Sequence, residues 1–299
     1  MIYQKTLVVI TGPTGSGKTD LAIELALRLG CEIISADSRQ MYRDLPIGTA
    51  APTASQLARV KHHLVGNLSL TDYYSAAKFE KDVLALLPEL WLHSDYAVMC
   101  GGSMMYIDAV CDGIDRLPTV SDANRAAALA VYEQGGLDAL KTRLAEVDPQ
   151  YLATAPDLNN HKRLVHALEI SMEAGVPYSS LLTGERVERP FNIIKLALNP
   201  PREVLFDRIN RRVDAMVETG LEAEARSVYP YKALNSLNTV GYKEMFAMFD
   251  GVMDRETAIA RIGKNTRVYA KKQLTWLKRD DRVIYIDSVE DAVAAIKHA

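Results

Sequence analysis

The chain has 299 residues, of which 48% are hydrophobic and 24% are charged, a composition typical of a globular protein with one large or two modest domains. It contains no run of about 18 apolar residues, so we expect no membrane span. Its three cysteines are too few and too scattered for a disulfide framework or a zinc site, which favours the reducing cytoplasm. The net charge of -3 gives by itself no indication of a nucleic-acid partner.

The first half of the chain alternates between strand and helix patterns. A strand is predicted at 6–11, followed by the loop GPTGSGKT at 12–19 and by a helix, DLAIELALRLG, that ends at Gly30. Further buried strands are predicted at 32–38 (EIISADS) and 96–102 (YAVMCGG), and the helix SMMYIDAVCDG follows the second of them. Such alternation is typical of a parallel sheet with helices packed on it.

The pattern changes near residue 114. From 114 to 190 the apolar residues recur at helical spacing, as in LAVYEQGGLDALKTRLAEV and KRLVHALEISMEAG, without a convincing strand. Strand patterns return at 191–200 and 282–288. The simplest fold is therefore α/β: a P-loop NTPase-like parallel-sheet core formed by 1–113 and 191–299, interrupted by an inserted all-helical domain at 114–190.

The loop at 12–19 has the phosphate-binding pattern Gly-x-x-x-x-Gly-Lys-Thr. It lies between a predicted strand and a predicted helix, which is the context in which this pattern is specific. Backbone N–H groups around Gly15 and Gly17, together with the helix N-terminus, can bind phosphate oxygens. Lys18 adds a positive charge, and the Thr19 hydroxyl is placed to contact Mg²⁺.

A nucleotide-hydrolysing protein with this loop usually also has an aspartate at the end of a second apolar strand. Here the predicted strand at 96–102 ends in glycines and Ser103, without a carboxylate, whereas the strand at 32–38 ends in Asp37. This combination suits a reaction in which a phosphate group is held while Asp37 accepts a proton. Asp37 could equally be a turn residue, because Asp-Ser often follows a strand in that role.

Six sequence blocks, in this order, give the chain its resemblance to the tRNA dimethylallyltransferase family: GPTGSGKT, SADSRQMYRDLPIGTA (35–50), GGSMMY (101–106), RVDAMVETGLEAEA (212–225), TVGYKEM (239–245) and TRVYAKKQLTWLK (266–278). The resemblance runs from the first strand nearly to the end of the chain. It implies transfer of a dimethylallyl group from dimethylallyl diphosphate to N6 of the adenosine 3′ of the anticodon in tRNA, giving N6-isopentenyladenosine, with Mg²⁺ as cofactor.

The resemblance also implies roles for individual residues. Asp37 is expected to be the general base. Ser103 is expected to be the second catalytic residue; it stands where the family usually has a threonine, and its hydroxyl should keep the same hydrogen bond. The diphosphate is expected to be held by Gly12, Pro13, Thr14, Gly15, Ser16, Gly17, Lys18, Thr19 and Arg212, with Thr19 also at the metal. Contacts to the anticodon stem-loop of tRNA are expected from Asp37, Ser38, Arg39, Gln40, Ser103, Arg125, Lys162, Arg163, His166, Gly241, Tyr242, Lys243, Lys271, Lys272, Gln273 and Lys278.

Some positions depart from the family pattern or are left open by it. In the insertion, Asn160, Lys162 and His166 replace the usual residues, although the basic character is kept. The roles of His62 and His63 are open, and Trp276 is better explained as a core anchor than as a stacking platform. A monomer is expected, acting on tRNAs that read codons beginning with U.

The distribution of charge gives an indication that is independent of the resemblance. Residues 255–282 carry nine Lys and Arg against three acidic residues, so this segment is +6 and the remainder of the chain is -9. In a helix, Lys264, Arg267, Lys271, Thr275 and Lys278 fall on one stripe. Such a stripe indicates a polyanion site, although a merely solvated helix face has the same pattern.

Two other classes of protein remain possible at this point. A small-molecule or nucleotide kinase could use the same loop, and the basic helix could serve as its lid, but the strand-end aspartate is missing. A non-catalytic RNA-binding protein with a vestigial loop is the other alternative. The intact Lys18, Thr19 and Asp37 argue against it.

Overall fold

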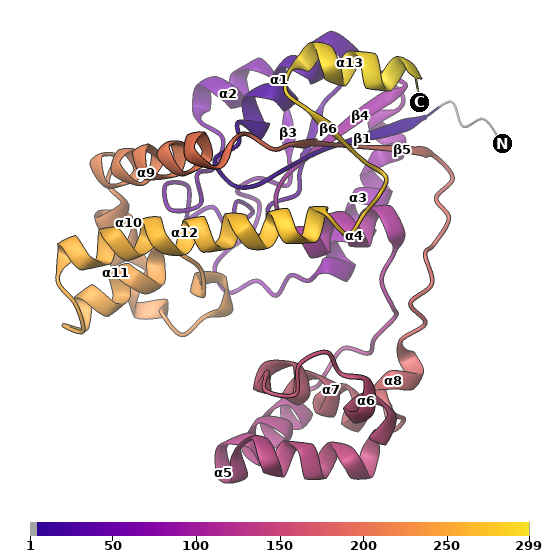
Figure 1. Ribbon diagram of the computed structural model, residues 1–299, viewed down its shortest axis with the longest axis vertical. Coiled ribbons are helices and arrows are strands. Elements are labelled where there is room, and N and C mark those ends of the chain that lie inside the picture. The colour runs from indigo at the N-terminus through magenta and orange to yellow at the C-terminus, as the bar shows by residue number, and fades with distance from the viewer. Residues whose placement is uncertain (1–4, 299) are drawn as a thin grey trace. The chain divides into compact units, whose positions relative to one another are not determined.

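The computed structural model describes residues 5–298 and contains a six-stranded parallel sheet flanked by helices (Figure 1). In sheet order the strands are β3 (His62–His63), β2 (Ile33–Ser35), β4 (Tyr96–Cys100), β1 (Thr6–Thr11), β5 (Asn192–Leu198) and β6 (Val283–Ile286). All five pairings between neighbours are parallel. The predicted α/β fold with a parallel-sheet core is therefore confirmed.

The central strand β1 is buried along its whole length, as its sequence TLVVIT predicts. Strands of a parallel sheet are covered on both faces and for this reason read as continuous apolar runs. Helices α1 (Lys18–Leu29) and α13 (Val289–His298) cover one face, and α3 (Ala76–Leu90) and α4 (Met104–Asp112) lie on the other (Figure 1). Helix α1 ends at Gly30, whose φ of 61° lies in the left-handed region, as predicted.

The predicted strands are present but shorter than the apolar runs that indicated them. The run 32–38 forms a strand only over Ile33–Ser35, because the chain then turns and the Asp37 side chain accepts hydrogen bonds from the turn. The two-residue strand β3 and the short helix α2 (Ala54–Arg59) carry too little apolar pattern to be predicted. The sheet thus has one more edge strand than the sequence indicated.

A group of helices packs beside the carboxyl edge of the sheet. It consists of α9 (Arg202–Glu218), α10 (Leu221–Val228), the 3₁₀ turns Tyr229–Tyr231 and Asn235–Leu237, α11 (Tyr242–Phe249) and α12 (Arg255–Leu277). Their shared core includes Leu221, Leu237, Tyr242, Met245 and Ile262. Leu205 and Ile209 of α9 pack against Ala270 of α12, which joins the two helices that carry most of the basic residues here.

Residues Gly113–Val187 form a second compact unit. Its bounds differ from the predicted 114–190 by one residue at the start and three at the end. It contains α5 (Asp122–Val147), interrupted at Gly136, and the shorter helices α6 (Pro149–Thr154), α7 (His161–Ala174) and α8 (Tyr178–Leu181). Its core is formed by Leu140, Leu144, Leu164 and Leu168. The fully buried Asp148 accepts hydrogen bonds from the backbone of Tyr151 and Ser179 and so joins α6 to α8.

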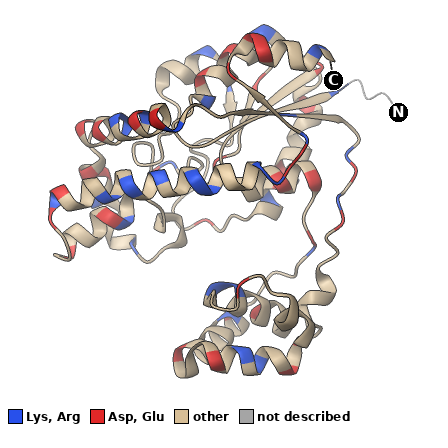
Figure 2. Ribbon diagram, in the orientation of Figure 1, with Lys and Arg blue, Asp and Glu red and all other residues tan. Residues whose placement is uncertain are grey.

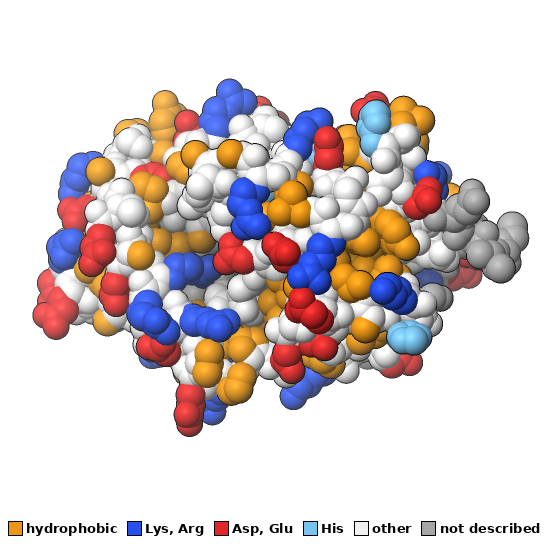
Figure 3. Space-filling view, turned by 90° about the horizontal axis from the view of Figure 1, so that it is seen from above, with side chains coloured by type: hydrophobic (Ala, Val, Ile, Leu, Met, Phe, Trp, Pro, Cys, Tyr) orange, Lys and Arg blue, Asp and Glu red, His pale blue; other side chains and the backbone are white. Residues whose placement is uncertain are grey.

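The surface is charged, and the signs are mixed on the face seen in Figure 3. Lys and Arg recur along α12 in Figure 2, as the sequence predicts. Among residues 5–298, no helix has the length and the apolar character that crossing a bilayer requires.

A buried ion cluster joins β5 to the segment that follows α12. Lys195 is 3% exposed, and its Nζ lies 2.6 Å from Asp280 Oδ2 and 3.2 Å from Asp112 Oδ2. Arg282 contacts the same two carboxylates. The hydrogen bonds from Arg282, reinforced by Lys195, hold the pKa of Asp280 well below its usual range.

We expect Asp280→Asn to lower the free energy of unfolding at neutral pH by about 1–3 kcal/mol, because two cations lose a shared carboxylate in a poorly hydrated site. A lowered folded-state pKa stabilises the protein above the unfolded value, about pH 4 for Asp, and this stabilisation is lost as the pH falls further. The difference between wild type and variant should therefore shrink below that pH. Urea unfolding at several pH values measures it, and the exposed neighbour Asp281→Asn is the control. Equal midpoints for all three proteins would contradict the expectation.

Candidate active site

The carboxyl ends of β1, β2 and β4 lie at the same edge of the sheet. Cys100 of β4 is aligned with Ile10 of β1 on one side and with Ser35 of β2 on the other. The loops that leave these strands carry the phosphate-loop pattern, Asp37 and Ser103. This edge is where parallel sheets bind ligands, and the loop and Asp37 lie on one cavity there, as the sequence indicated.

The phosphate loop has the tight backbone that its glycines predict. At Gly12 the φ is +138°, and a Cβ would lie 2.6 Å from the carbonyl oxygen of Leu198. Lys18 turns back onto the loop, and its Nζ donates to the carbonyl of Pro13 at 2.9 Å. Burial, reinforced by the neighbouring Arg212, lowers the pKa of Lys18 to about 8. The ammonium group is thus poorly solvated. Among residues 5–298 no carboxylate forms an ion pair with it, although the nearby Asp37 acts to raise its pKa.

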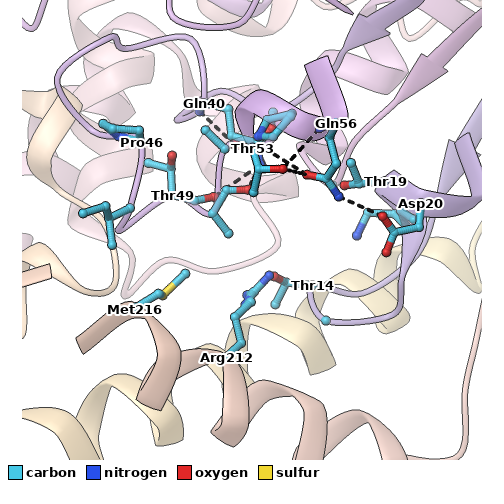
Figure 4. A pocket seen from close by; sticks show the side chains of 18 of the residues that line it. Thr14, Thr19, Asp20, Gln40, Pro46, Thr49, Thr53, Gln56, Arg212 and Met216 are labelled. Carbon is cyan, nitrogen blue, oxygen red and sulfur yellow. Dashed lines mark hydrogen bonds between the residues drawn. The ribbon is translucent and has the colours of Figure 1, made fainter. Parts of the chain in front are cut away.

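Two arginines of α9 lie against the loop. Arg212 Nη2 donates to Thr14 Oγ1 at 2.5 Å, and Figure 4 shows the side chain pointing toward Thr14. The Nε of Arg212 is buried without a hydrogen-bond partner in the described chain, and burial lowers the pKa of this side chain. Arg208 Nη1 donates to the carbonyl of Ser16 at 3.1 Å. Arg208 was not predicted, although its i, i+4 spacing from Arg212 places both on one helix face.

Two cavities meet at this edge of the sheet. The larger, of about 710 Å³, is lined by the phosphate loop, by Arg208 and Arg212 and by residues 46–47, 49–54 and 56. The smaller, of about 320 Å³, is lined by Ser38, Arg39, Ser103, Tyr269 and residues 238–241 and 243. They share Thr14, Asp37, Thr49, Arg212 and Met216. Asp37 is therefore accessible from both sides.

Asp37 is both a turn residue and a candidate base. Its Oδ1 accepts from the backbone N–H of Arg39 at 2.9 Å and of Gln40 at 3.4 Å, which fixes the side chain. Its other oxygen makes no hydrogen bond within residues 5–298. Ser103 lies nearby, and its Oγ accepts from the backbone N–H of Ser38 at 2.8 Å. One carboxylate oxygen thus holds the turn while the second is free for a ligand.

Comparison with known proteins places the chain in a family. Its sequence matches the IPP transferase family over residues 40–280. It is 55% identical over 280 residues to tRNA dimethylallyltransferase 1 of Phocaeicola vulgatus, covering 94% of this chain and 93% of that protein. The chain belongs to the tRNA dimethylallyltransferase family. This confirms the resemblance seen in the sequence.

Solved structures agree with this assignment. A tRNA isopentenylpyrophosphate transferase of Bacillus halodurans is 36% identical, with a TM-score of 0.68, and the match covers 95% of this chain and 90% of that one. A eukaryotic dimethylallyltransferase acting on tRNA is 25% identical, with a TM-score of 0.75, over 91% of this chain and 70% of that one.

Three residues that the family resemblance assigned to tRNA have their side chains engaged inside the protein. Gln273 is 3% exposed; its Oε1 accepts from the backbone N–H of Thr14 at 2.8 Å, and its Nε2 donates to the carbonyl of Gly102 at 2.9 Å. Tyr242 is fully buried, and Gln40 Nε2 donates to the carbonyl of Ala50 at 2.9 Å. These side chains position loops of the site, and Gln40 also lines the larger cavity. The expected contacts of these three residues with tRNA stay predictions.

The remaining expected tRNA contacts of the sheet-containing unit fall into two groups. Arg39, Gly241 and Lys243 line the smaller cavity with Asp37, Ser38 and Ser103. Lys271 and Lys272 of α12 are exposed, and so is Lys278, which caps the end of this helix. Arg267, part of the predicted stripe, instead donates to Asn210 Oδ1 and lies over the Phe206 ring of α9. The stripe is therefore an exposed row with one member fixed against α9.

In the helical unit, the expected contacts form a cluster on α5 and α7. Glu169 accepts from His166 Nδ1 at 3.0 Å, and Arg125 Nε lies 3.6 Å from its other oxygen. Lys162 and Arg163 are exposed in the first turn of α7, which Asn160 caps through its side chain. The residues that depart from the family pattern thus keep a helix cap and a basic surface.

The residues left open by the sequence have packing roles. Trp276 Nε1 donates to Asp108 Oδ2 at 2.9 Å, which joins α12 to α4. His63 lies on the edge strand β3, and its Nε2 is 2.6 Å from Glu32 Oε2. Both contacts are consistent with anchoring of the fold.

The larger cavity offers oxygen atoms to a hard cation. Thr19, Asp20 and Asp37 line it with a hydroxyl and two carboxylates. Among residues 5–298, no three His, Cys, Asp or Glu side chains converge as a self-contained metal site. Mg²⁺ is usually bound by one or two carboxylates together with waters and substrate phosphates, so this wall fits the ion when a phosphorylated ligand is present.

The lowered pKa of Lys18 predicts a pH dependence of anion binding. Only the protonated ammonium attracts a phosphate, and it loses its proton as the pH rises through about 8. Affinity for inorganic diphosphate with Mg²⁺ should therefore fall by about tenfold between roughly pH 7 and pH 9, beyond the titration of the ligand itself. Calorimetric titration measures this. Lys18→Arg, whose guanidinium stays protonated, shares the ligand's titration and should lack the additional fall; identical profiles would contradict the assignment.

Proposed function

We propose that this protein transfers a dimethylallyl group from dimethylallyl diphosphate to N6 of the adenosine 3′ of the anticodon in tRNA, giving N6-isopentenyladenosine. The observation that carries the proposal is the meeting of two cavities at Asp37, one with a phosphate loop and one with a polar and basic wall. Membership of the family supports the same reaction. The enzyme would act on tRNA as a cytoplasmic monomer.

The phosphate-loop cavity suits the donor. Lys18, Arg208 and Arg212 place three cationic side chains around the loop, and the buried Nε of Arg212 has no hydrogen-bond partner within residues 5–298. Fixed positive charge in a poorly hydrated cavity stabilises the negative charge that develops on a departing diphosphate. The Thr19 hydroxyl would hold Mg²⁺ against the phosphates, where the ion would neutralise part of this charge.

The smaller cavity suits the acceptor. A base in an anticodon loop can be extruded into a pocket at lower cost than a paired base. The exocyclic amine of adenine is a weak nucleophile, and the free oxygen of Asp37 is available to accept its proton. The bond between N6 and the allylic carbon forms, the bond between that carbon and the diphosphate oxygen breaks, the proton goes to Asp37 and diphosphate leaves.

Packing at the end of β4 argues against the alternative that the protein is a kinase. At Gly101, where a metal-binding carboxylate would be needed, a Cβ would lie 2.2 Å from the carbonyl oxygen of Ala36. At Gly102 a Cβ would lie 2.3 Å from Gln273 Nε2. These positions have no room for an aspartate, so the loop faces a leaving group without the strand-end acid that phosphoryl transfer to or from a nucleotide usually uses.

The deciding experiment is incubation with labelled dimethylallyl diphosphate and tRNA that lacks the modification. Label should enter tRNA, and nuclease digestion should yield N6-isopentenyladenosine. ATP with Mg²⁺ should be turned over neither with nor without tRNA. Robust ATP hydrolysis without prenyl transfer would favour a kinase or an ATPase instead.

Asp37→Ala should lower turnover by roughly 10²–10⁴-fold, because the amine loses its proton acceptor. Binding of tRNA should change much less. Single-turnover transfer and a filter-binding titration separate the two effects. Asp44→Ala, an exposed aspartate on the same segment, is the matched control. Near-normal turnover of Asp37→Ala would leave Asp37 as a turn residue only.

The basic stripe on α12 should contribute affinity for tRNA through phosphate contacts, which carry little sequence information. The double reversal Lys271→Glu with Lys278→Glu should weaken tRNA binding. It should also reduce the slope of log binding constant against log salt concentration by about 1.4–1.8, the value expected for the loss of two phosphate contacts. Binding should be titrated at several salt concentrations. Lys81→Glu with Lys297→Glu changes the charge equally on exposed residues of α3 and α13 and should leave the slope unchanged. Equal slopes for both pairs would mean that the stripe is only a solvated face.

A further inference from the structure

The segment Pro46–Ala51 forms a wall at the place where the two cavities meet. All its residues except Gly48 line the larger cavity, and Gly48 and Thr49 line the smaller one. Pro46 and Thr49 lie across the cavity from Arg212 and Met216 (Figure 4). The segment has no strand or helix of its own. Two internal backbone hydrogen bonds shape its turn, from the N–H of Ala50 to the carbonyl of Ile47 and from the N–H of Ala51 to the carbonyl of Pro46, both at 3.0 Å. Contacts with other parts of the protein hold this turn in place at the cavity.

Glu224 of α10 provides the main contacts. Its Oε2 accepts from the backbone N–H of Ile47 at 2.8 Å, and its Oε1 accepts from the backbone N–H of Gly48 at 2.8 Å. The same Oε1 accepts from the Tyr242 hydroxyl at 2.6 Å. Hydrogen bonds to an ionised carboxylate are about twice as strong as bonds between neutral groups. One side chain thus fixes two successive peptide groups of the wall.

Tyr242 supports this contact through both its ring and its hydroxyl. It is fully buried, and its ring lies so close to Gly48 that a Cβ there would be 2.6 Å from the ring and hydroxyl atoms. Burial and the adjacent carboxylate raise the pKa of Tyr242, so its hydroxyl stays protonated and remains a donor to Glu224. The ring blocks movement of Gly48 in one direction, and the hydroxyl orients Glu224.

The far end of the segment is held in an unfavourable backbone conformation. Ala50 has a φ of 51°, in the left-handed region that a residue with a Cβ adopts only at a cost in free energy. Gln40 Nε2 donates to the carbonyls of Thr49 and Ala50, at 3.3 Å and 2.9 Å. Such a conformation persists only where surrounding contacts impose it. Here the contacts come from Glu224 at one end and Gln40 at the other.

We propose that Glu224 is a positioning residue for prenyl transfer: it holds segment 46–51 as the wall that keeps water away from the allylic carbon. This inference rests on the proposed function. An allylic diphosphate held between the phosphate loop and Asp37 has its reacting carbon at the junction that this segment borders. A carbon activated for attack by a weak amine also reacts with water, giving dimethylallyl alcohol, diphosphate and a proton. A loosened wall therefore diverts the donor from tRNA to water.

The test is the ratio of dimethylallyl alcohol to prenylated tRNA formed from labelled donor. Glu224→Gln keeps the size of the side chain, but its amide NH₂ would face a backbone N–H where a carboxylate oxygen now accepts. We expect the ratio to rise by about tenfold, which corresponds to the loss of one charge-assisted hydrogen bond. Glu222→Gln, an acidic residue on the same helix that pairs with Arg226 and Arg255, is the matched control and should leave the ratio unchanged. A lower folded fraction alone would reduce both products together and would not alter the ratio.

Hydrogen exchange of the Ile47 and Gly48 amides gives a readout that does not depend on prenyl transfer. Both amides should exchange faster in Glu224→Gln and at the wild-type rate in Glu222→Gln. If Glu224→Gln does not fold, Tyr242→Phe, which removes one of the three hydrogen bonds, should show smaller changes in the same direction.

Unchanged exchange would overturn the inference, and so would faster exchange with an unchanged product ratio. A wild-type protein that forms no prenylated tRNA would overturn the proposed function itself, and with it any role of Glu224 in transfer. Failure of the proposed function is thus read from the wild type, and failure of the inference from the variants.

Discussion

The parallel pairing of β4 with both β1 and β2 is the interaction on which the site depends. The backbone N–H of Gly101 donates to the carbonyl of Ile10, and the N–H of Ala36 donates to the carbonyl of Cys100, at 3.1 Å and 2.8 Å. The chain leaves β4 so close to β2 that only glycine fits at 101. This approach brings Ser103 to the turn that holds Asp37. A one-residue slip of register would reverse the faces of the strand and separate these groups.

The second constraint is that the site holds cationic groups away from water. Among residues 5–298 no carboxylate forms an ion pair with Lys18 or Arg212, although the nearby Asp37 acts to raise the pKa of both. Burial lowers the pKa of Lys18 and of Arg212, which means that each charge is less well solvated here than in water. Their hydrogen bonds go to Pro13 and Thr14 of the phosphate loop, and Arg212 retains a buried Nε that has no hydrogen-bond partner in the part of the chain that the structure describes. An anion that enters satisfies these groups together. These cationic groups therefore stabilise negative charge most strongly at the phosphates of a ligand, and not at the base that is modified.

The sequence predicts the parts of this site that depend on position along the chain. The phosphate loop, Asp37 and Arg212 were recognisable because their motifs fix local geometry. The internal hydrogen bonds of Gln273 and the burial of Tyr242 were not predicted, because a family motif gives a position along the chain but not the contacts of its side chain. For Gln273 a signal existed, since it shares a helical face with Ala270 and Leu277. For the contacts of Glu224 the sequence contains no such signal, because its partner Gly48 lies 176 residues away along the chain.

Helix α12 shows how one element can separate binding from chemistry. Successive residues of an α-helix are rotated by about 100°, so Lys271 and Gln273, two positions apart, face nearly opposite directions. Gln273 joins the phosphate loop to Gly102 inside the protein, while Lys271 is exposed near Phe206 of α9. Charges on the outer face can therefore alter affinity for a polyanion without touching the reacting groups. The inner face acts in the opposite way, because any shift of α12 moves Gln273 and, through it, both the phosphate loop and the strand end that leads to Ser103.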